Sequence, residues 1–184
     1  GVAYQRTYDS FGRLKSYPLG NPAGVGIAAG LVRTLSYDNA GRIIGYTHTN
    51  ASGPQAAFDQ TFAYDGVDRL IWANIGGSPT YGYEYDATGN RTLLTVTGSP
   101  YIHAVSPTSN RLTSVQIAGE GNTPITQPIS YDAAGNTTQT TSGSTSTSPL
   151  GFIYSDRGRL KEVKVPNPQN VNTPDTITYL TNGL

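Results

Sequence analysis

The stretch that decides the fold is YDATGN at residues 85–90, because near-copies of it recur along the whole chain. They are YDSFGR from Tyr8, YDNAGR from Tyr37, YDGVDR from Tyr64 and YDAAGN from Tyr131. Asp at the first turn position and Gly at the fourth favour a type I turn followed by one left-handed residue, a common hairpin loop. Glycine adopts a positive φ without steric cost. Each copy therefore predicts a β-hairpin corner.

Two copies lack the glycine, and their replacements support the same turn. Asp68 and Asn110 stand in its place, and Asp and Asn are the residue types that best tolerate a left-handed backbone. The predicted corners lie at residues 9–13, 38–42, 65–69, 86–90, 107–111, 132–136 and 155–159.

The repeat fills the chain, with successive units beginning 21 to 29 residues apart. The units start near Tyr8, Tyr37, Tyr64, Tyr85, Ser106, Tyr131, Tyr154 and Tyr179. A period of this length is typical of arrays in which each unit buries surface against its neighbours. We therefore expect residues 1–184 to form part of one repeat array, with no separate domain.

The residues around each corner predict two paired strands. Aromatic and β-branched residues alternate with polar ones before the motif, as strands require. A three-residue loop then places Tyr8 opposite Leu14, Tyr37 opposite Ile43 and Tyr64 opposite Leu70. On the other face, each motif aspartate meets the residue four positions later, often an arginine. The spacing of Leu112 and Val115 in the second strand predicts a bulge that absorbs one residue.

Composition excludes several classes of function. Twelve basic residues balance twelve acidic ones, so there is no basic field for nucleic acid or an anionic membrane. The chain has no cysteine, which excludes disulfides and thiolate metal sites. No apolar run approaches the roughly 18 residues of a membrane span, and no signal-peptide pattern opens the chain. Because methionine is absent, we expect the chain to begin mid-protein or after processing.

The YDxxGRL motif at this spacing resembles the YD repeat of the Rhs family, which includes bacterial polymorphic toxins, the B and C components of insecticidal toxin complexes, and teneurins. The resemblance covers about residues 4 to 184 and implies an all-β fold of tandem hairpins in a continuous spiralling antiparallel sheet that forms a hollow shell. The chain departs from the motif at Ser106-Pro107, Ser155, Leu180, Asn90 and Asn136. The motif residues are Tyr8, Asp9, Gly12, Arg13, Tyr37, Asp38, Gly41, Arg42, Tyr64, Asp65, Arg69, Tyr85, Asp86, Gly89, Tyr131, Asp132, Gly135, Tyr154, Gly158 and Arg159.

The resemblance implies a structural, non-enzymatic segment of a secreted bacterial protein, whose shell encapsulates a C-terminal toxin domain. Its partners would be the remaining repeats and the cargo domain of the same polypeptide, with no cofactor. An alternative is an extracellular adhesion or carbohydrate-binding surface, with the tyrosines as a stacking track. An enzyme is the weakest alternative, because no acid–base or nucleophile constellation appears in the sequence.

Other residue patterns have structural interpretations. The aspartates at 9, 38, 65, 86 and 132 supply one carboxylate per unit, whereas calcium takes six to eight oxygens, so we expect no metal site. We interpret His48 and His103 as surface loop or strand residues whose replacement does little. GNPAGVGIAAG at residues 20–30 predicts a long turn without the P-loop lysine, and residues 140–149 predict a polar insertion.

Two further expectations concern modification and association. Asn50, Asn90 and Asn136 open N-x-S/T sequons, which matter only if the host glycosylates secreted proteins. The chain is expected to begin in a strand, Val2 to Tyr8. Since uncapped repeat arrays leave bare strand edges, we expect isolated residues 1–184 to associate or to be poorly soluble.

Overall fold

The computed structural model describes residues 5–20, 29–118, 123–141, 149–167, 169 and 173–179. Within these ranges the fold is all-β, as the sequence predicts: sixteen strands and a single 3-10 turn, η1 (Ala56–Phe58). The strands are β1 (Thr7–Tyr8), β2 (Leu14–Pro18), β3 (Val32–Tyr37), β4 (Ile43–Asn50), β5 (Gly53–Pro54), β6 (Gln60–Tyr64), β7 (Leu70–Ile75), β8 (Thr80–Tyr85), β9 (Arg91–Val96), β10 (Ser99–Val105), β11 (Leu112–Ala118), β12 (Pro124–Tyr131), β13 (Thr137–Thr141), β14 (Pro149–Tyr154), β15 (Leu160–Val165) and β16 (Asp175–Thr178). The described part contains no helix long and apolar enough to cross a membrane.

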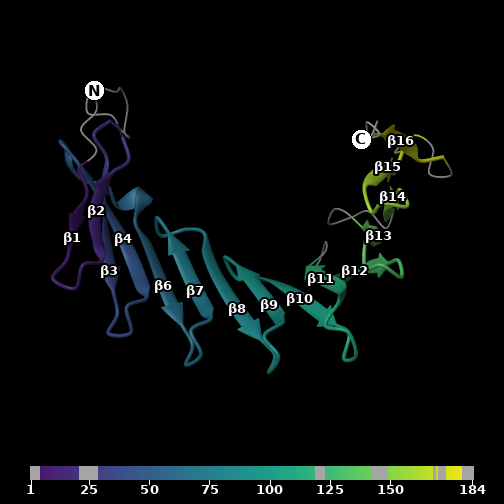
Figure 1. The fold of residues 1–184 in the computed structure, drawn as a ribbon, viewed down its shortest axis with the longest axis horizontal. Helices are drawn as coiled ribbons and strands as arrows, with labels where there is room; N and C mark the ends of the chain where they lie inside the picture. Colours follow the sequence, from purple (N-terminus) through teal and green to yellow (C-terminus); the bar gives the residue numbers. More distant parts are fainter. Residues whose placement is uncertain are drawn as a thin grey trace. The chain divides into compact units, whose positions relative to one another are not determined.

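The chain divides into two compact units. The first comprises residues 1–83 and 95–98, and the second comprises residues 84–94 and 99–184. In the first unit the neighbouring strands follow the order β1-β2-β3-β4-β6-β7-β8, with β5 paired to the end of β4. In the second, β10 to β16 are neighbours in sequence order. Figure 1 shows the β1–β2, β3–β4 and β6–β7 corners along one edge of the first unit.

The predicted register is confirmed at the corners of the first unit. Tyr8 pairs with Leu14, Tyr37 with Ile43 and Tyr64 with Leu70, all between antiparallel strands. The predicted bulge is present too: Ala104 pairs with Ser114 while Val105 pairs with Leu112, so one residue of β11 is left over. The same one-residue shift in register occurs at every motif tyrosine whose pairing is described. Besides the three pairs above, these are Tyr131 with Thr137 and Tyr154 with Leu160.

The two faces of the first unit differ in chemistry. On one face Leu35 lies opposite Tyr46, and the Tyr46 ring meets the edge of Phe62 with centroids 5.4 Å apart. On the other face Thr34 lies opposite Thr47. Few of the described residues are buried: Leu31, Gly45, His48, Ala73 and His103. Each unit is therefore a single sheet layer with half-buried side chains, and lateral contacts between hairpins must supply much of its stability.

Several predictions need correction or fall outside the described residues. The corner predicted at 107–111 begins one residue earlier, because Ser106 N donates to the carbonyl of Arg111 at 2.8 Å. Val105, and not Ser106, therefore occupies the tyrosine place. Of the strand expected from Val2 to Tyr8, only Thr7–Tyr8 is in a strand, and residues 1–4 lie outside the described ranges. Most of the turn at 20–30 lies outside them, as does Leu180. Of the insertion predicted at 140–149, residues 140–141 end β13 and Pro149 begins β14, and residues 142–148 lie outside the described ranges.

Candidate functional site: the corner ladder

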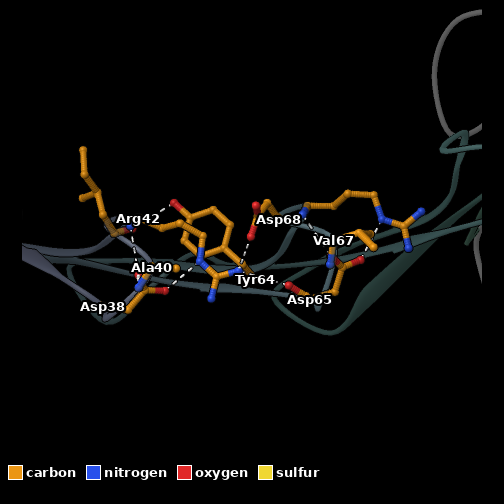
Figure 2. A network of polar contacts seen from close by, with 9 residues as sticks. Asp38, Ala40, Arg42, Tyr64, Asp65, Val67 and Asp68 are labelled. Carbon is orange, nitrogen blue, oxygen red and sulfur yellow. Dashed lines mark hydrogen bonds and ion pairs between the residues drawn. The ribbon is translucent and has the colours of Figure 1, made fainter.

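Each hairpin corner is built around its aspartate. Asp38 Oδ1 accepts from the backbone N–H groups of Ala40 and Arg42, at 3.0 and 2.9 Å, and Oδ2 accepts from Arg42 Nε at 2.7 Å. The Gly41 N–H closes the turn onto the Asp38 carbonyl at 3.0 Å. Figure 2 shows this arrangement beside the next corner. The side chain thus holds both the turn and the first residue of the returning strand.

The same carboxylate geometry recurs in four other corners. Arginine binds the aspartate in two of them and asparagine in the other two; the pairs are Asp9 with Arg13, Asp65 with Arg69, Asp86 with Asn90, and Asp132 with Asn136. In the corner that follows Tyr154, Ser155 takes the aspartate place, and its Oγ accepts from the N–H of Arg159 at 3.3 Å. The asparagine and serine departures therefore keep the turn.

Hydrogen bonding keeps these carboxylates ionised. The guanidinium of Arg42 is the main reason that the pKa of Asp38 lies below its usual range. At Asp86 the side-chain amide of Asn90 is the largest cause of a pKa lowered to about 2, with further bonds from Thr88. Because both oxygens of each carboxylate are bonded within the corner, they are poorly placed to ligate a cation. The described residues contain no group of three or more His, Cys, Asp or Glu side chains that could hold a metal ion.

The motif tyrosine of one corner reaches back to the preceding corner. The hydroxyl of Tyr37 donates to the carbonyl of Leu14 at 2.7 Å, and that of Tyr64 donates to the carbonyl of Ile43 at 2.8 Å. Tyr131 makes the same bond to Leu112 at 2.8 Å. In each case the acceptor is the residue directly after the last corner position. The tyrosine is therefore a strand residue whose hydroxyl also bonds its hairpin to the preceding one.

The last residue of a corner contacts the tyrosine ring of the next corner. The guanidinium carbon of Arg13 lies 4.3 Å from the ring centroid of Tyr37, and that of Arg42 lies 5.1 Å from the ring centroid of Tyr64. Arg111 stands in the same relation to Tyr131, at 5.5 Å. Such cation–π contacts contribute about 0.5–1 kcal/mol each at exposed sites. We call this set of aspartates, tyrosines and last-position residues the corner ladder.

Where the left-handed residue before the last corner position is not glycine, its side chain bonds the preceding corner. Asp68 holds φ at 66° and accepts from Arg42 Nη1 at 2.7 Å, which also donates to the Asp65 carbonyl at 3.1 Å. These contacts are drawn in Figure 2. Asn110 holds φ at 51° and accepts from Asn90 Nδ2 at 3.1 Å. The two replacements therefore keep the left-handed turn and add a bond to the preceding corner.

The expectation that His48 is a surface residue is wrong, although it does lie on a strand, β4. Its side chain is 1% exposed, because η1 folds back over the end of β4 and places Phe58 against it. Arg33 Nε donates to His48 Nε2 at 3.0 Å, so the ring proton must be on Nδ1, which lies 3.2 Å from Asp59 Oδ1. The side chain is thus a neutral bridge between an arginine and a carboxylate.

His103, on β10, is also buried, so the same correction applies. Its Nδ1 lies 3.2 Å from the carbonyl oxygen of Arg91, an acceptor that requires the proton on Nδ1. Arg91 Nε lies 3.4 Å from the same nitrogen and cannot donate to it in that tautomer. Burial, followed by the charge of Arg91, lowers the pKa of His103. Sequence reasoning missed the burial of both histidines, although His48 shares its strand face with Tyr46 and His103 lies two residues before Val105, which occupies the tyrosine place.

Two of the three sequon asparagines are part of the ladder. The amides of Asn90 and Asn136 donate to their corner aspartates at 2.9 and 2.8 Å. Asn50 instead accepts from the backbone N–H of Ser52 at 2.9 Å. A glycan on Asn90 or Asn136 would therefore replace one of the two hydrogens of an amide that bonds its corner aspartate.

No family model and no curated protein matches this sequence. Solved structures do match it. The crystal structures of TcdB2-TccC3-Cdc42 and of TcdB2-TccC3-TEV each cover 88% of the chain, with a TM-score of 0.59 and 16% sequence identity. That of TcdB2-TccC3 covers 86% with the same TM-score and identity. The chain spans only 9% of the length of each matched chain. At this identity the likeness establishes that the sheet shares its fold with those matched chains.

Proposed function

We propose that this chain is a structural, non-enzymatic segment of a secreted Rhs-type protein, and that its sheet forms part of a shell around a C-terminal toxin domain. The observation that carries the proposal is the corner ladder, in which Tyr37, Tyr64 and Tyr131 each donate a hydrogen bond to a carbonyl of the preceding hairpin. Such a contact can be repeated without limit, so it extends a sheet and does not create a pocket. The likeness of fold to TcdB2-TccC3 supports the same interpretation.

The thinness of the sheet also supports a wall. Two of the described apolar side chains, Leu31 and Ala73, are buried, and most strand residues are half-buried. A wall one sheet thick has solvent or contents on each face, which suits tyrosine, because its ring packs while its hydroxyl is bonded or hydrated. Function would then depend on closure of the sheet and on no individual catalytic side chain.

Limited proteolysis of the full-length parent protein tests the proposal. If the repeats enclose the downstream domain, that domain resists protease in the native protein. The double variant Arg42→Ala/Tyr64→Ala removes both side chains that join two neighbouring hairpins, so it should make the downstream domain digestible. Ser36→Ala, an exposed strand position, is the matched control and should leave it protected. A downstream domain that is digested equally in the native protein and in the double variant contradicts containment.

The alternative of a carbohydrate-binding surface rests on one feature. Phe11 is 81% exposed and borders a cavity of about 390 Å³ with Arg13, Tyr37 and Asn39. An exposed aromatic ring beside polar side chains is a combination suited to a sugar. Binding of the chain to a glycan array that is lost in Phe11→Ala, with the downstream domain digested in the native parent, would favour this alternative.

A further inference from the structure

A second set of polar side chains crosses the first unit, away from the corners. Tyr17 of β2 lies opposite Arg33 of β3, and Arg33 lies opposite His48 of β4. Asp59, directly before β6, lies beside His48. We call these four residues the polar row. The polar row joins three consecutive hairpins, β1–β2, β3–β4 and β6–β7, at the ends opposite to their corners.

Hydrogen bonds run through the polar row in one direction. Arg33 donates from Nη1 to the hydroxyl oxygen of Tyr17 at 3.3 Å, and from Nε to His48 Nε2 at 3.0 Å. His48 in turn donates from Nδ1 to Asp59 Oδ1 at 3.2 Å. Because the His48 side chain is 1% exposed, both bonds of its ring lie away from solvent.

The lone pair of His48 Nε2 is the place where a proton can add to this ring. Neutral histidine has one donor and one acceptor nitrogen, whereas both nitrogens of the charged ring are donors. The acceptor nitrogen of His48 already receives the Nε–H group of Arg33. A proton taken up from solvent at Nε2 would therefore set two donors and two positive charges against each other across 3.0 Å. Like charges this close repel strongly away from water, so the contact cannot persist.

The bond to Asp59 survives the same protonation. Asp59 Oδ1 accepts from the backbone N–H of His48 at 2.8 Å as well as from the ring. The Asp59 carbonyl also accepts from the N–H of Gly76 at 2.7 Å, which holds this residue in place. A carboxylate next to a charged imidazole favours the charged form. Arg33 is therefore the member of the polar row that must move.

The other elements packed on β4 offer few ionisable side chains to His48. β5 and η1 contain none, and Tyr64 of β6 belongs to the corner end of its strand. Tyr46 of β4 lies beside Arg33, whose guanidinium carbon is 4.5 Å from the ring centroid. Among the residue types of the polar row, only histidine ordinarily changes its charge between about pH 5 and 8. Mild acid therefore acts on the polar row through His48.

We propose that His48 is a pH-sensitive switch within the sheet. While the ring is neutral, Arg33 is bound to it, and side chains connect the three hairpins without a break. When Nε2 takes up a proton, Arg33 leaves the ring, and the bond between His48 and Asp59 remains. The side-chain connection from Tyr17 to His48 is then lost, so the first two hairpins become more loosely joined at this end. The switch acts whether or not the sheet encloses a cargo.

NMR titration between about pH 8 and 5 tests the switch. The chain is labelled with ¹³C at histidine ε1, with ¹⁵N in arginine and with ¹³C in the tyrosine rings. We expect the Arg33 Nε–H signal to change with the same midpoint as the His48 signal. The Tyr46 ring signals should change with them, because the guanidinium leaves the ring. His103→Gln, in the other unit, is the matched control and should leave this transition unchanged.

Two variants make the test decisive. His48→Gln keeps an acceptor for Arg33 but cannot be protonated, so the Arg33 signal should stay constant over the whole range. Arg33→Met removes the donor, so the Tyr46 ring signals should change at least threefold less while His48 still titrates. This second variant remains informative if the first does not fold. The proposal is overturned if His48 takes up a proton while the Arg33 signal stays constant, if His48 remains neutral throughout the titration, or if folded His48→Gln shows the native Arg33 transition.

Discussion

Arg42 lies over the ring of Tyr64, with its guanidinium carbon 5.1 Å from the ring centroid, while the Tyr64 hydroxyl bonds the carbonyl of the residue next to Arg42. A single pair of side chains thereby joins two consecutive hairpins twice, once by the cation–π contact and once by the hydrogen bond. This reciprocity explains why the motif keeps a tyrosine before the turn and a long polar residue after it.

Removing only the hydroxyl of Tyr64 tests the hydrogen bond to the preceding hairpin separately from the cation–π contact. Tyr64→Phe keeps the ring under Arg42 and loses the bond to Ile43, so we expect the free energy of unfolding to fall by about 0.5–1.5 kcal/mol. Urea denaturation measures this change. Tyr8→Phe is the matched control, because Tyr8 begins the first corner and is 58% exposed, and it should change little. Equal effects of the two substitutions would show that the lateral bond contributes nothing.

The left-handed position of the corner can be tested with two glycines. Gly89 has φ at 91° with open space around it, so Gly89→Ala meets only backbone strain and should cost about 1–2 kcal/mol. Gly66 also lies in open space but is not among the residues with positive φ, so Gly66→Ala should be neutral or slightly stabilising. Gly89→Asn should cost less than Gly89→Ala, since Asn110 holds the same position. Thermal unfolding of the three variants compares them directly, and an equal loss in both alanine variants would contradict the turn argument.

The sequence predicts the corners well because their chemistry is local. Asp38 and Gly41 specify the turn within four residues, and the turn then determines that Tyr37 faces Ile43. The ladder is less accessible to sequence reasoning. The contact of Arg42 with Asp68 depends on which hairpins become neighbours and how far apart they lie, and the linkers between corners vary in length.

The burial of the two histidines also could not be predicted from local sequence. Their strand positions follow from alternation, but the burial of His48 depends on η1 returning over β4, which no local motif encodes. The position of His103 beside the corner is recognised only when Val105 is assigned to the tyrosine place. The one-residue insertion in that corner conceals this alignment in the sequence.

Acid should loosen the corners in a defined pH range. The folded-state pKa of Asp86 is about 2 against an ordinary 3.8, chiefly because Asn90 bonds its ionised form. A depressed folded pKa adds stability that is fully present above the unfolded value and is lost as pH falls from about 4 through 2. NMR titration of the Asp86 carboxyl should give a midpoint near 2, and Asn90→Ala should move it toward 3.8. An unchanged midpoint in that variant would show that the amide is not the cause.

The buried bridge at His48 gives the largest expected effect on stability. His48→Ala would empty a fully buried site and leave Arg33 without the acceptor that it now has 3.0 Å away. Large-to-small changes at buried positions and unsatisfied buried donors each cost about 1–3 kcal/mol or more, so we expect a loss of roughly 2–4 kcal/mol. Thr47→Ala, at the exposed neighbouring position of β4, is the matched control and should stay within about 0.5 kcal/mol. Chemical denaturation measures both variants. Hydrogen exchange should also show faster opening at Gln55, whose N–H bonds the His48 carbonyl at 2.7 Å, because η1 loses the side chain against which Phe58 rests. If His48→Ala is as stable as Thr47→Ala, the bridge between Arg33 and Asp59 does not hold η1 on the sheet.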